Sequence, residues 1–181
     1  MAEASRWNRK RLVIDASVAR SAGETEHPVS KSCREFLEAV RGICHRLVFT
    51  EAIRDEWRRH ESRYSRRWLV SMYAKKKVDR IDPDPAASMQ TQIEAIPLSS
   101  RKRQAVLKDR HLLEAALLAD GIVASGDDTA RNILREASST WRAVKRMVWV
   151  NPGKPEEDCC DWLAAGARAE KGRMIGTAHG A

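Results

Sequence analysis

Four acidic residues stand at positions where the chain could use them for chemistry. Asp15 and Asp127 follow short apolar segments, Asp109 opens an alanine-rich segment, and Glu56 lies six residues after Thr50. Unit charges about 4 Å apart repel by about 4 kcal/mol at an effective dielectric constant of ~20, so carboxylates that meet must be protonated or neutralised by a cation. Hard oxygen ligands select Mg²⁺ or Mn²⁺, which can orient a water molecule and stabilise charge on a phosphoryl group.

Short apolar runs separated by amphipathic segments predict the elements that must position these acids. We expect strands at residues 12–14, 47–49, 122–124 and 147–150, and helices at about 30–43, 51–75, 109–120, 129–137 and 155–166. Unbroken apolar strands alternating with helices indicate an α/β fold, a short parallel sheet of about four to five strands flanked by helices on both faces. Functional groups collect at the carboxyl ends of such strands, so the acids could converge there.

The remaining segments suggest loops and one domain. The three prolines in residues 79–98 predict a loop with one short helical piece, and residues 166–181 are expected to be loose. We expect a domain over residues 11–150 and a C-terminal extension over 151–181 whose last part is flexible. The chain has 181 residues, which suits a single domain.

The ordered set of motifs resembles the PIN-domain nucleases. It consists of a strand followed by Asp15-Ala16-Ser17-Val18, Thr50 followed by Glu56, Asp109 opening a helix, and Ser125-Gly126-Asp127 after a strand. The resemblance covers about residues 11–150. It implies a Mg²⁺- or Mn²⁺-dependent nuclease, very often a ribonuclease, and many members are toxins of toxin–antitoxin pairs. Asp15, Asp109 and Asp127 would bind the metal, Glu56 would be a ligand or orient water, and Ser17 would orient a ligand or water.

Several alternatives stay open at this point. Compact toxin members are shorter than this chain, which makes the toxin assignment weaker than the nuclease assignment. Asp127 is favoured over its neighbour Asp128, which could instead cap the next helix. A catalytically inactive nucleic-acid- or protein-binding module on the same fold is the main rival. An aspartyl-phosphate hydrolase is a further alternative, but its chemistry requires a second Asp two residues after Asp15, where this chain has Ser17.

Basic residues near the acids suggest a track for a phosphate backbone. On a helix over residues 51–75, bases at offsets of 3, 4, 7 and 11 from Glu56 would share much the same face. A lysine run and a second cluster before Asp109 extend the positive area. The expected nucleic-acid-binding residues are Arg59, His60, Arg63, Arg67, Lys75, Lys76, Lys77, Arg101 and Arg103. Charged runs are also the usual composition of a solvated helix face.

Composition and charge limit the class of protein. Lys and Arg number 33 against 25 Asp and Glu, a net charge of +8, which is typical of a protein with a polyanionic partner and equally of one whose charge serves solubility alone. We expect that partner to be nucleic acid, RNA rather than DNA by resemblance alone, with a protein antitoxin or other regulator as a further partner. The four cysteines include no Cys-x-x-Cys pair, and no apolar segment resembles a membrane span. A reducing, cytoplasmic location is expected, and the oligomeric state, a homodimer included, is left open.

Overall fold

The computed structural model describes residues 9–177 and confirms the α/β fold class. Five parallel strands form one sheet in the order β3-β2-β1-β4-β5. The strands are β1 (Arg11–Ile14), β2 (Arg46–Phe49), β3 (Val78–Arg80), β4 (Ile122–Ala124) and β5 (Val148–Val150). In register, Val13 pairs with Val48 on one side and Val123 on the other. Every residue of β4 and β5 is buried, as expected for a parallel sheet covered on both faces.

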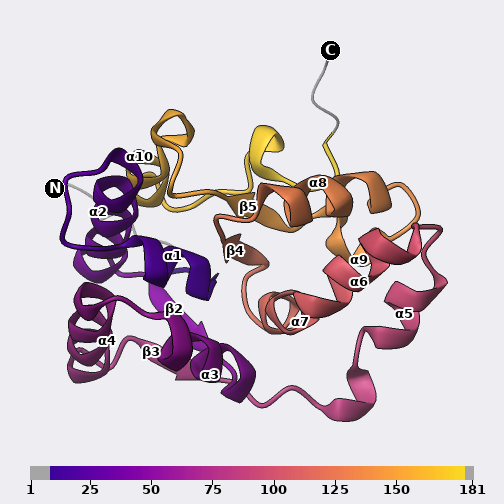
Figure 1. Ribbon diagram of the computed structural model, residues 1–181, viewed down its shortest axis with the longest axis horizontal. Helices are drawn as coiled ribbons and strands as arrows, with labels where there is room; N and C mark the ends of the chain where they lie inside the picture. The colour runs from indigo at the N-terminus through magenta and orange to yellow at the C-terminus, as the bar shows by residue number, and fades with distance from the viewer. Residues whose placement is uncertain (1–8, 178–181) are drawn as a thin grey trace, which may run out of the picture.

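Ten α-helices flank the sheet within the described residues. They are α1 (Ala16–Ser21), α2 (Pro28–Gly42), α3 (Glu51–His60), α4 (Arg63–Ala74), α5 (Gln90–Ala95), α6 (Ser100–Lys108), α7 (Arg110–Leu117), α8 (Asp128–Ala137), α9 (Arg142–Lys145) and α10 (Cys159–Ala164). Three short 3₁₀ helices complete the elements: η1 (Pro85–Ala87), η2 (Pro155–Glu157) and η3 (Lys171–Arg173). In Figure 1, α2, α4 and α10 gather on one side of the strands and α5 to α9 on the other.

The expected helix over residues 51–75 is wrong, because it is broken into α3 and α4. Ser62 caps α4, and its side chain accepts from the Ser65 backbone N–H at 3.1 Å. The same hydroxyl donates to the carbonyl of Ala22 at 2.5 Å, and the Ser65 hydroxyl donates to the carbonyl of Ala19 at 2.8 Å. The end of α1 therefore holds the start of α4, since its last carbonyls need donors that the helix itself does not supply.

The segment expected to be a loop over residues 79–98 contributes the edge strand β3 and the short helices η1 and α5. The three strand residues, Val-Asp-Arg, include only one apolar side chain. The sequence therefore lacks the run of apolar residues from which a buried strand is predicted. The second of these residues, Asp79, pairs with Arg46 on β2. This pairing attaches the edge strand to its neighbour from the exposed side.

The C-terminal extension packs on the same body as the preceding residues. The buried His45 ring lies between the carbonyl of Leu163, 2.9 Å from Nε2, and the Lys10 N–H, 3.2 Å from Nδ1. Ile175 is 1% exposed and its N–H donates to the Met147 carbonyl. The expectation of a loose end is therefore wrong for residues 166–177, whereas residues 178–181 lie outside the described chain. No helix in the described range has the length and apolar character to cross a membrane.

Candidate active site

Asp15 is held at the carboxyl edge of the sheet by backbone and side-chain hydrogen bonds. Its N–H donates to the carbonyl of Ala124 at 2.9 Å, which ties it to the end of β4. It stands at the N-cap position of α1, yet its side chain makes no capping hydrogen bond. Instead, Oδ2 accepts from the hydroxyls of Ser17 at 2.5 Å and Ser125 at 2.9 Å. A purely capping role for Asp15 is therefore excluded, and two hydroxyls orient its carboxylate.

Asp127, rather than Asp128, faces the same opening. Asp127 Oδ1 accepts from the Ala130 N–H at 2.8 Å and so caps α8, the role that the sequence suggested for Asp128. Its second carboxylate oxygen makes no hydrogen bond to a residue in 9–177. Asp128 turns outward, where Oδ2 lies 2.8 Å from Lys154 Nζ and accepts from the Asn151 side chain at 3.0 Å. Asp128 therefore belongs to a surface ion-pair network.

Glu56 reaches the opening from α3. The buried Trp57 beside it donates from Nε1 to the carbonyl of Ile14 at 2.8 Å and packs edge-on against Phe49, with ring centroids 5.2 Å apart. This contact fixes α3 next to the end of β1. Glu56 Oε2 lies 3.0 Å from Nε2 of His111, and the other ring nitrogen lies 3.1 Å from the Lys108 carbonyl.

Asp109 lies at the junction where α6 ends and α7 begins. Its carbonyl accepts from the N–H groups of Leu112 and Leu113, but its carboxylate makes no capping hydrogen bond. The pKa of Asp109 is raised to about 6, first by burial and then by the charges of Asp15 and Asp127, against smaller opposite effects of Lys108 and His111. The shift records that three carboxylates act on one another through a partly buried space.

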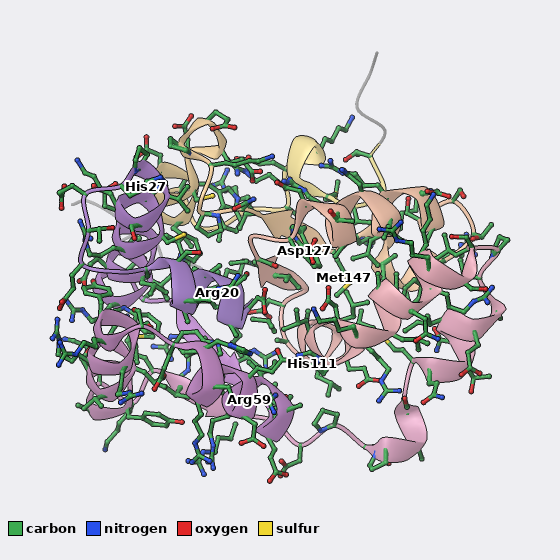
Figure 2. The ribbon with its side chains drawn as sticks, in the orientation of Figure 1. Arg20, His27, Arg59, His111, Asp127 and Met147 are labelled. Carbon is green, nitrogen blue, oxygen red and sulfur yellow. The ribbon has the colours of Figure 1, made fainter. Side chains whose placement is uncertain are left out.

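The four predicted acids line one pocket of about 270 Å³. They come from four places in the chain: the end of β1, helix α3, the α6–α7 junction and the loop after β4. The pocket is lined by Asp15, Ala16, Ser17, Arg20, Glu56, His60, Lys108, Asp109, Gly126 and Asp127. Figure 2 shows Arg20, Asp127 and His111 around this central region of the molecule.

The loop that carries Asp127 closes tightly over Ser17. The Gly126 N–H donates to the Ser17 hydroxyl at 3.0 Å, and a Cβ placed on Gly126 would lie 3.5 Å from that oxygen. The Ser125 hydroxyl also accepts from the Asp127 N–H at 3.1 Å. Ser17 and Ser125 therefore connect Asp15 to the Asp127 loop and set the spacing of the two acids.

The predicted basic residues divide into three groups. His60 lines the pocket, and Arg59 and Arg101 are exposed. Arg63 and Arg67 lie on α4, so one continuous helix face from Glu56 is ruled out by the break after His60, and Arg67 pairs with Glu24. The third group, which does not line the pocket, consists of Lys75, Lys76, Lys77 and Arg103.

Lys75, Lys76 and Lys77 precede β3 and therefore lie at the amino edge of the sheet, opposite the acids. Lys77 Nζ donates to carbonyls at the end of α2, including that of Arg41 at 2.8 Å. Arg103 donates to the carbonyls of Ile96 at 3.2 Å and Leu98 at 2.9 Å. Lys77 and Arg103 therefore use their donors to close helix ends and a loop, which corrects their expected role on a phosphate track.

Sequence reasoning missed two cations at the pocket, Arg20 and Lys108. Arg20 could have been predicted, because it follows Ser17 by three residues. In a helix that starts at residue 16, the two side chains lie on the same face. Lys108 directly precedes Asp109, but nothing local tells which way it turns. Neither makes an ion pair with any residue in the part of the chain that the structure describes.

The pocket suits a hard divalent cation in charge and donor type. Its acidic groups offer carboxylate oxygens, and the raised pKa of Asp109 reflects burial and, after it, repulsion by Asp15 and Asp127 that a cation would relieve. Among residues 9–177 no three His, Cys, Asp or Glu side chains already stand in an arrangement that would hold an ion. An ion would therefore have to draw the carboxylates inward by side-chain rotation, and Asp15, Asp109 and Asp127 are the residues placed to do so.

Comparisons of the chain with family models, with curated proteins and with solved structures find no match.

Proposed function

We propose that this protein is a divalent-metal-dependent endonuclease of the PIN-domain type that hydrolyses phosphodiester bonds in RNA. The observation that carries the proposal is the meeting of four acids from four separate elements in one pocket, where the pKa of Asp109 rises to about 6. Such a cluster is costly unless it serves a cation or a proton transfer. The order of the acids along an all-parallel α/β sheet supports the same assignment.

In the proposed site, Asp15, Asp109 and Asp127 would hold Mg²⁺ or Mn²⁺. The bound ion would supply charge neutralisation at the scissile phosphate and an activated water. Ser17 and Ser125 keep Asp15 oriented through the hydrogen bonds described above. Glu56, held by His111 at the wall of the pocket, is suited to orient the attacking water or to act as a further ligand.

Cations on two walls of the pocket support a substrate that continues on both sides of the cleaved bond. Arg20 and His60 lie on α1 and α3, and Lys108 lies at the end of α6. Phosphates before and after the scissile one could therefore each meet a base, as the interior of a strand requires. We propose RNA and not DNA as the substrate on the basis of the family resemblance alone.

The cellular setting follows from the cysteines and the resemblance. Cys33, Cys159 and Cys160 form no disulfide with one another in the described part of the chain, which supports a reducing cytoplasm. A role as the toxin of a toxin–antitoxin pair, with a protein antitoxin as regulator, is the biological form of the proposal that the resemblance favours.

The proposal is tested by cleavage of labelled single-stranded RNA and DNA with Mn²⁺, Mg²⁺ or EDTA. We expect cleavage with metal, none in EDTA, and a loss of about a hundredfold or more in Asp15→Asn and Asp109→Asn. The control is Asp55→Asn, which removes an acid from α3 that lies outside the pocket and pairs with Arg58 at 3.6 Å. RNA binding without cleavage, equal in wild type and Asp15→Asn, would instead identify a non-catalytic binding module.

A further inference from the structure

Another cavity lies along α8 from Asn132 onward and shares no lining residue with the acidic pocket. Its volume is about 570 Å³, and its polar lining comes from α8, α9 and the end of the described chain. The polar lining residues are Asn132, Arg135, Ser138, Ser139, Lys145 and Thr177. No carboxylate of residues 9–177 lines it, although α8 itself contains Asp128 and Glu136. The cavity is therefore positive in character.

Arg135 is incompletely satisfied in this cavity. Its Nε is buried and has no hydrogen-bond partner in the described chain. Burial lowers the pKa of the Arg135 guanidinium, and the nearby charge of Arg131 lowers it further. Leaving a buried donor unpaired is unfavourable, more so for a charged group. The terminal guanidinium nitrogens of Arg135 are not buried and have no hydrogen-bond partner within residues 9–177, so they are the atoms that an anion in the cavity would reach.

The two carboxylates whose charges act on Arg135, Glu157 and Asp128, make their hydrogen bonds and ion pairs with other residues. Glu157 Oε1 lies 2.6 Å from Arg131 Nη1, and Glu157 Oε2 accepts from the Asn151 N–H at 2.9 Å. Asp128 is paired with Lys154 at 2.8 Å. These acids stabilise the Arg135 charge from a distance but do not hydrogen-bond to it.

Backbone hydrogen bonds and a close contact hold residues 175–176 against Met147 and Lys145 at this cavity. The N–H of Ile175 donates to the Met147 carbonyl at 2.8 Å, and the N–H of Gly176 donates to the Lys145 carbonyl at 2.9 Å. A Cβ on Gly176 would stand 2.1 Å from Lys145 Cγ and 2.7 Å from the Lys145 carbonyl oxygen. Glycine is therefore needed for this close approach to Lys145, which lines the same cavity as Arg135. Figure 1 shows the yellow end of the chain beside α8.

We propose that this cavity binds a phosphate group, with Arg135 and Lys145 as its cationic ligands. Arginine suits this role because its planar fork matches two phosphate oxygens, while lysine adds a point charge. Arg135 follows Asp127 by eight residues, which at about 1.5 Å per residue places the two about 12 Å apart along the axis of α8. The site is therefore distinct from the acidic pocket, and the proposal does not depend on nuclease activity.

Calorimetric titration with inorganic pyrophosphate in EDTA tests the site. We expect saturable binding that weakens about tenfold in Arg135→Gln and in Lys145→Gln, and about threefold in Arg135→Lys, which keeps the charge but loses the fork. The matched control is Arg142→Gln on α9, an exposed arginine that does not line the cavity and should change the Kd less than about twofold. Thermal unfolding checks that each variant is folded.

The proposal is overturned if wild type shows no saturable binding, or if Arg135→Gln, shown to be folded, binds pyrophosphate as tightly as Arg142→Gln does. A second arm uses an eight-nucleotide single-stranded RNA in EDTA to identify the source of the phosphate. Weaker RNA binding in Arg135→Gln would assign the site to a nucleic-acid strand. Unchanged RNA binding beside weakened pyrophosphate binding would assign it to a free phosphate compound.

Discussion

At the scale of single residues, the carboxylates of the site differ in the hydrogen bonds that they accept. Asp15 accepts two hydroxyl donors and Asp127 accepts a backbone N–H, whereas the carboxylate of Asp109 caps neither of the helices that it joins. Burial and the charges of Asp15 and Asp127 disfavour the charged form of Asp109 and raise its pKa to about 6. Metal binding and stability should both depend on this residue.

The raised pKa of Asp109 predicts a pH-dependent stability cost. Its pKa is 3.8 in the unfolded reference and about 6 in the folded protein, so the folded state holds a proton that the unfolded state has lost between these values. Stability contributed by this group therefore falls as the pH rises from about 4 to 6. Without metal, Asp109→Asn should be more stable than wild type by roughly 1–3 kcal/mol at pH 7.5, and this gain should vanish near pH 4.

Urea denaturation of wild type and Asp109→Asn at pH 4 and pH 7.5 in EDTA measures this difference. A gain of the same size at both pH values would show that the effect comes from packing instead of charge. Asp55→Asn serves as the control, because Asp55 lies outside the pocket and should show no such pH dependence.

The two serines that hold Asp15 should matter for turnover more than for stability. Ser125→Ala removes a hydroxyl that donates to Asp15 and accepts from the Asp127 N–H. If the proposed nuclease is correct, kcat should fall about 10- to 100-fold, as for other residues that orient metal ligands. Thr140→Ala, which removes a hydroxyl that donates to the Ala137 carbonyl at 3.2 Å and lines neither the pocket nor the cavity beside α8, is the comparison and should leave kcat unchanged.

At the scale of elements, the sequence predicts most of the sheet but not how its helices are divided. Four of the five strands were found because runs such as Val148-Trp149-Val150 are wholly buried. The edge strand Val78–Arg80 was missed, since an edge strand with one apolar residue lacks that pattern. The acids were found from their places at strand ends, because parallel strands bring such positions to one edge.

The parts that could not be predicted depend on contacts between distant segments. Apolar periodicity continues through α3 and α4, and the break between them arises because Ser62 binds the end of α1. Likewise, Lys77 and Arg103 look like surface bases until the carbonyls that accept their hydrogen bonds are in place. Arg20 and Lys108 enter the site only because α1 and α6 face each other across the pocket.

The junction of α3 and α4 gives a prediction at this scale. Ser62→Ala removes the N-cap of α4 and the hydrogen bond to the Ala22 carbonyl, and should destabilise the protein by about 1–2 kcal/mol. Ser99→Ala at the cap of α6 is the comparison; its side chain accepts only from Lys102, at 3.4 Å, so a smaller loss is expected. Equal losses in urea denaturation would mean that the link to α1 contributes nothing.

At the scale of the whole molecule, a net charge of +8 surrounds a pocket lined by four acids. Many bases are engaged by acids or carbonyls, so net charge alone does not show where a polyanion would bind. Arg20 and Lys108 line the pocket beside the acids and make no ion pair with another residue in 9–177. Binding driven by phosphates releases counterions and weakens steeply with salt.

The salt dependence of RNA binding should therefore identify these two residues. In an Asp15→Asn background with EDTA, Arg20→Ala and Lys108→Ala should each lower the slope of log affinity against log salt by about 0.7, the value for one phosphate contact on a single strand. Arg58→Ala, an exposed base on α3 that pairs with Asp55, should leave the slope unchanged. Equal slopes in all variants would place the strand elsewhere on the surface.

The most direct measurement is Mn²⁺ binding to the wild-type protein and to Asp15→Asn and Asp109→Asn, followed by the loss of the free-ion electron paramagnetic resonance signal at pH 7.5. The account predicts saturable binding in the wild type that is lost in both variants and retained in Asp55→Asn. Wild-type protein that leaves Mn²⁺ free, or variants that bind it as tightly as the wild type, would contradict the claim that these acids share a metal ion.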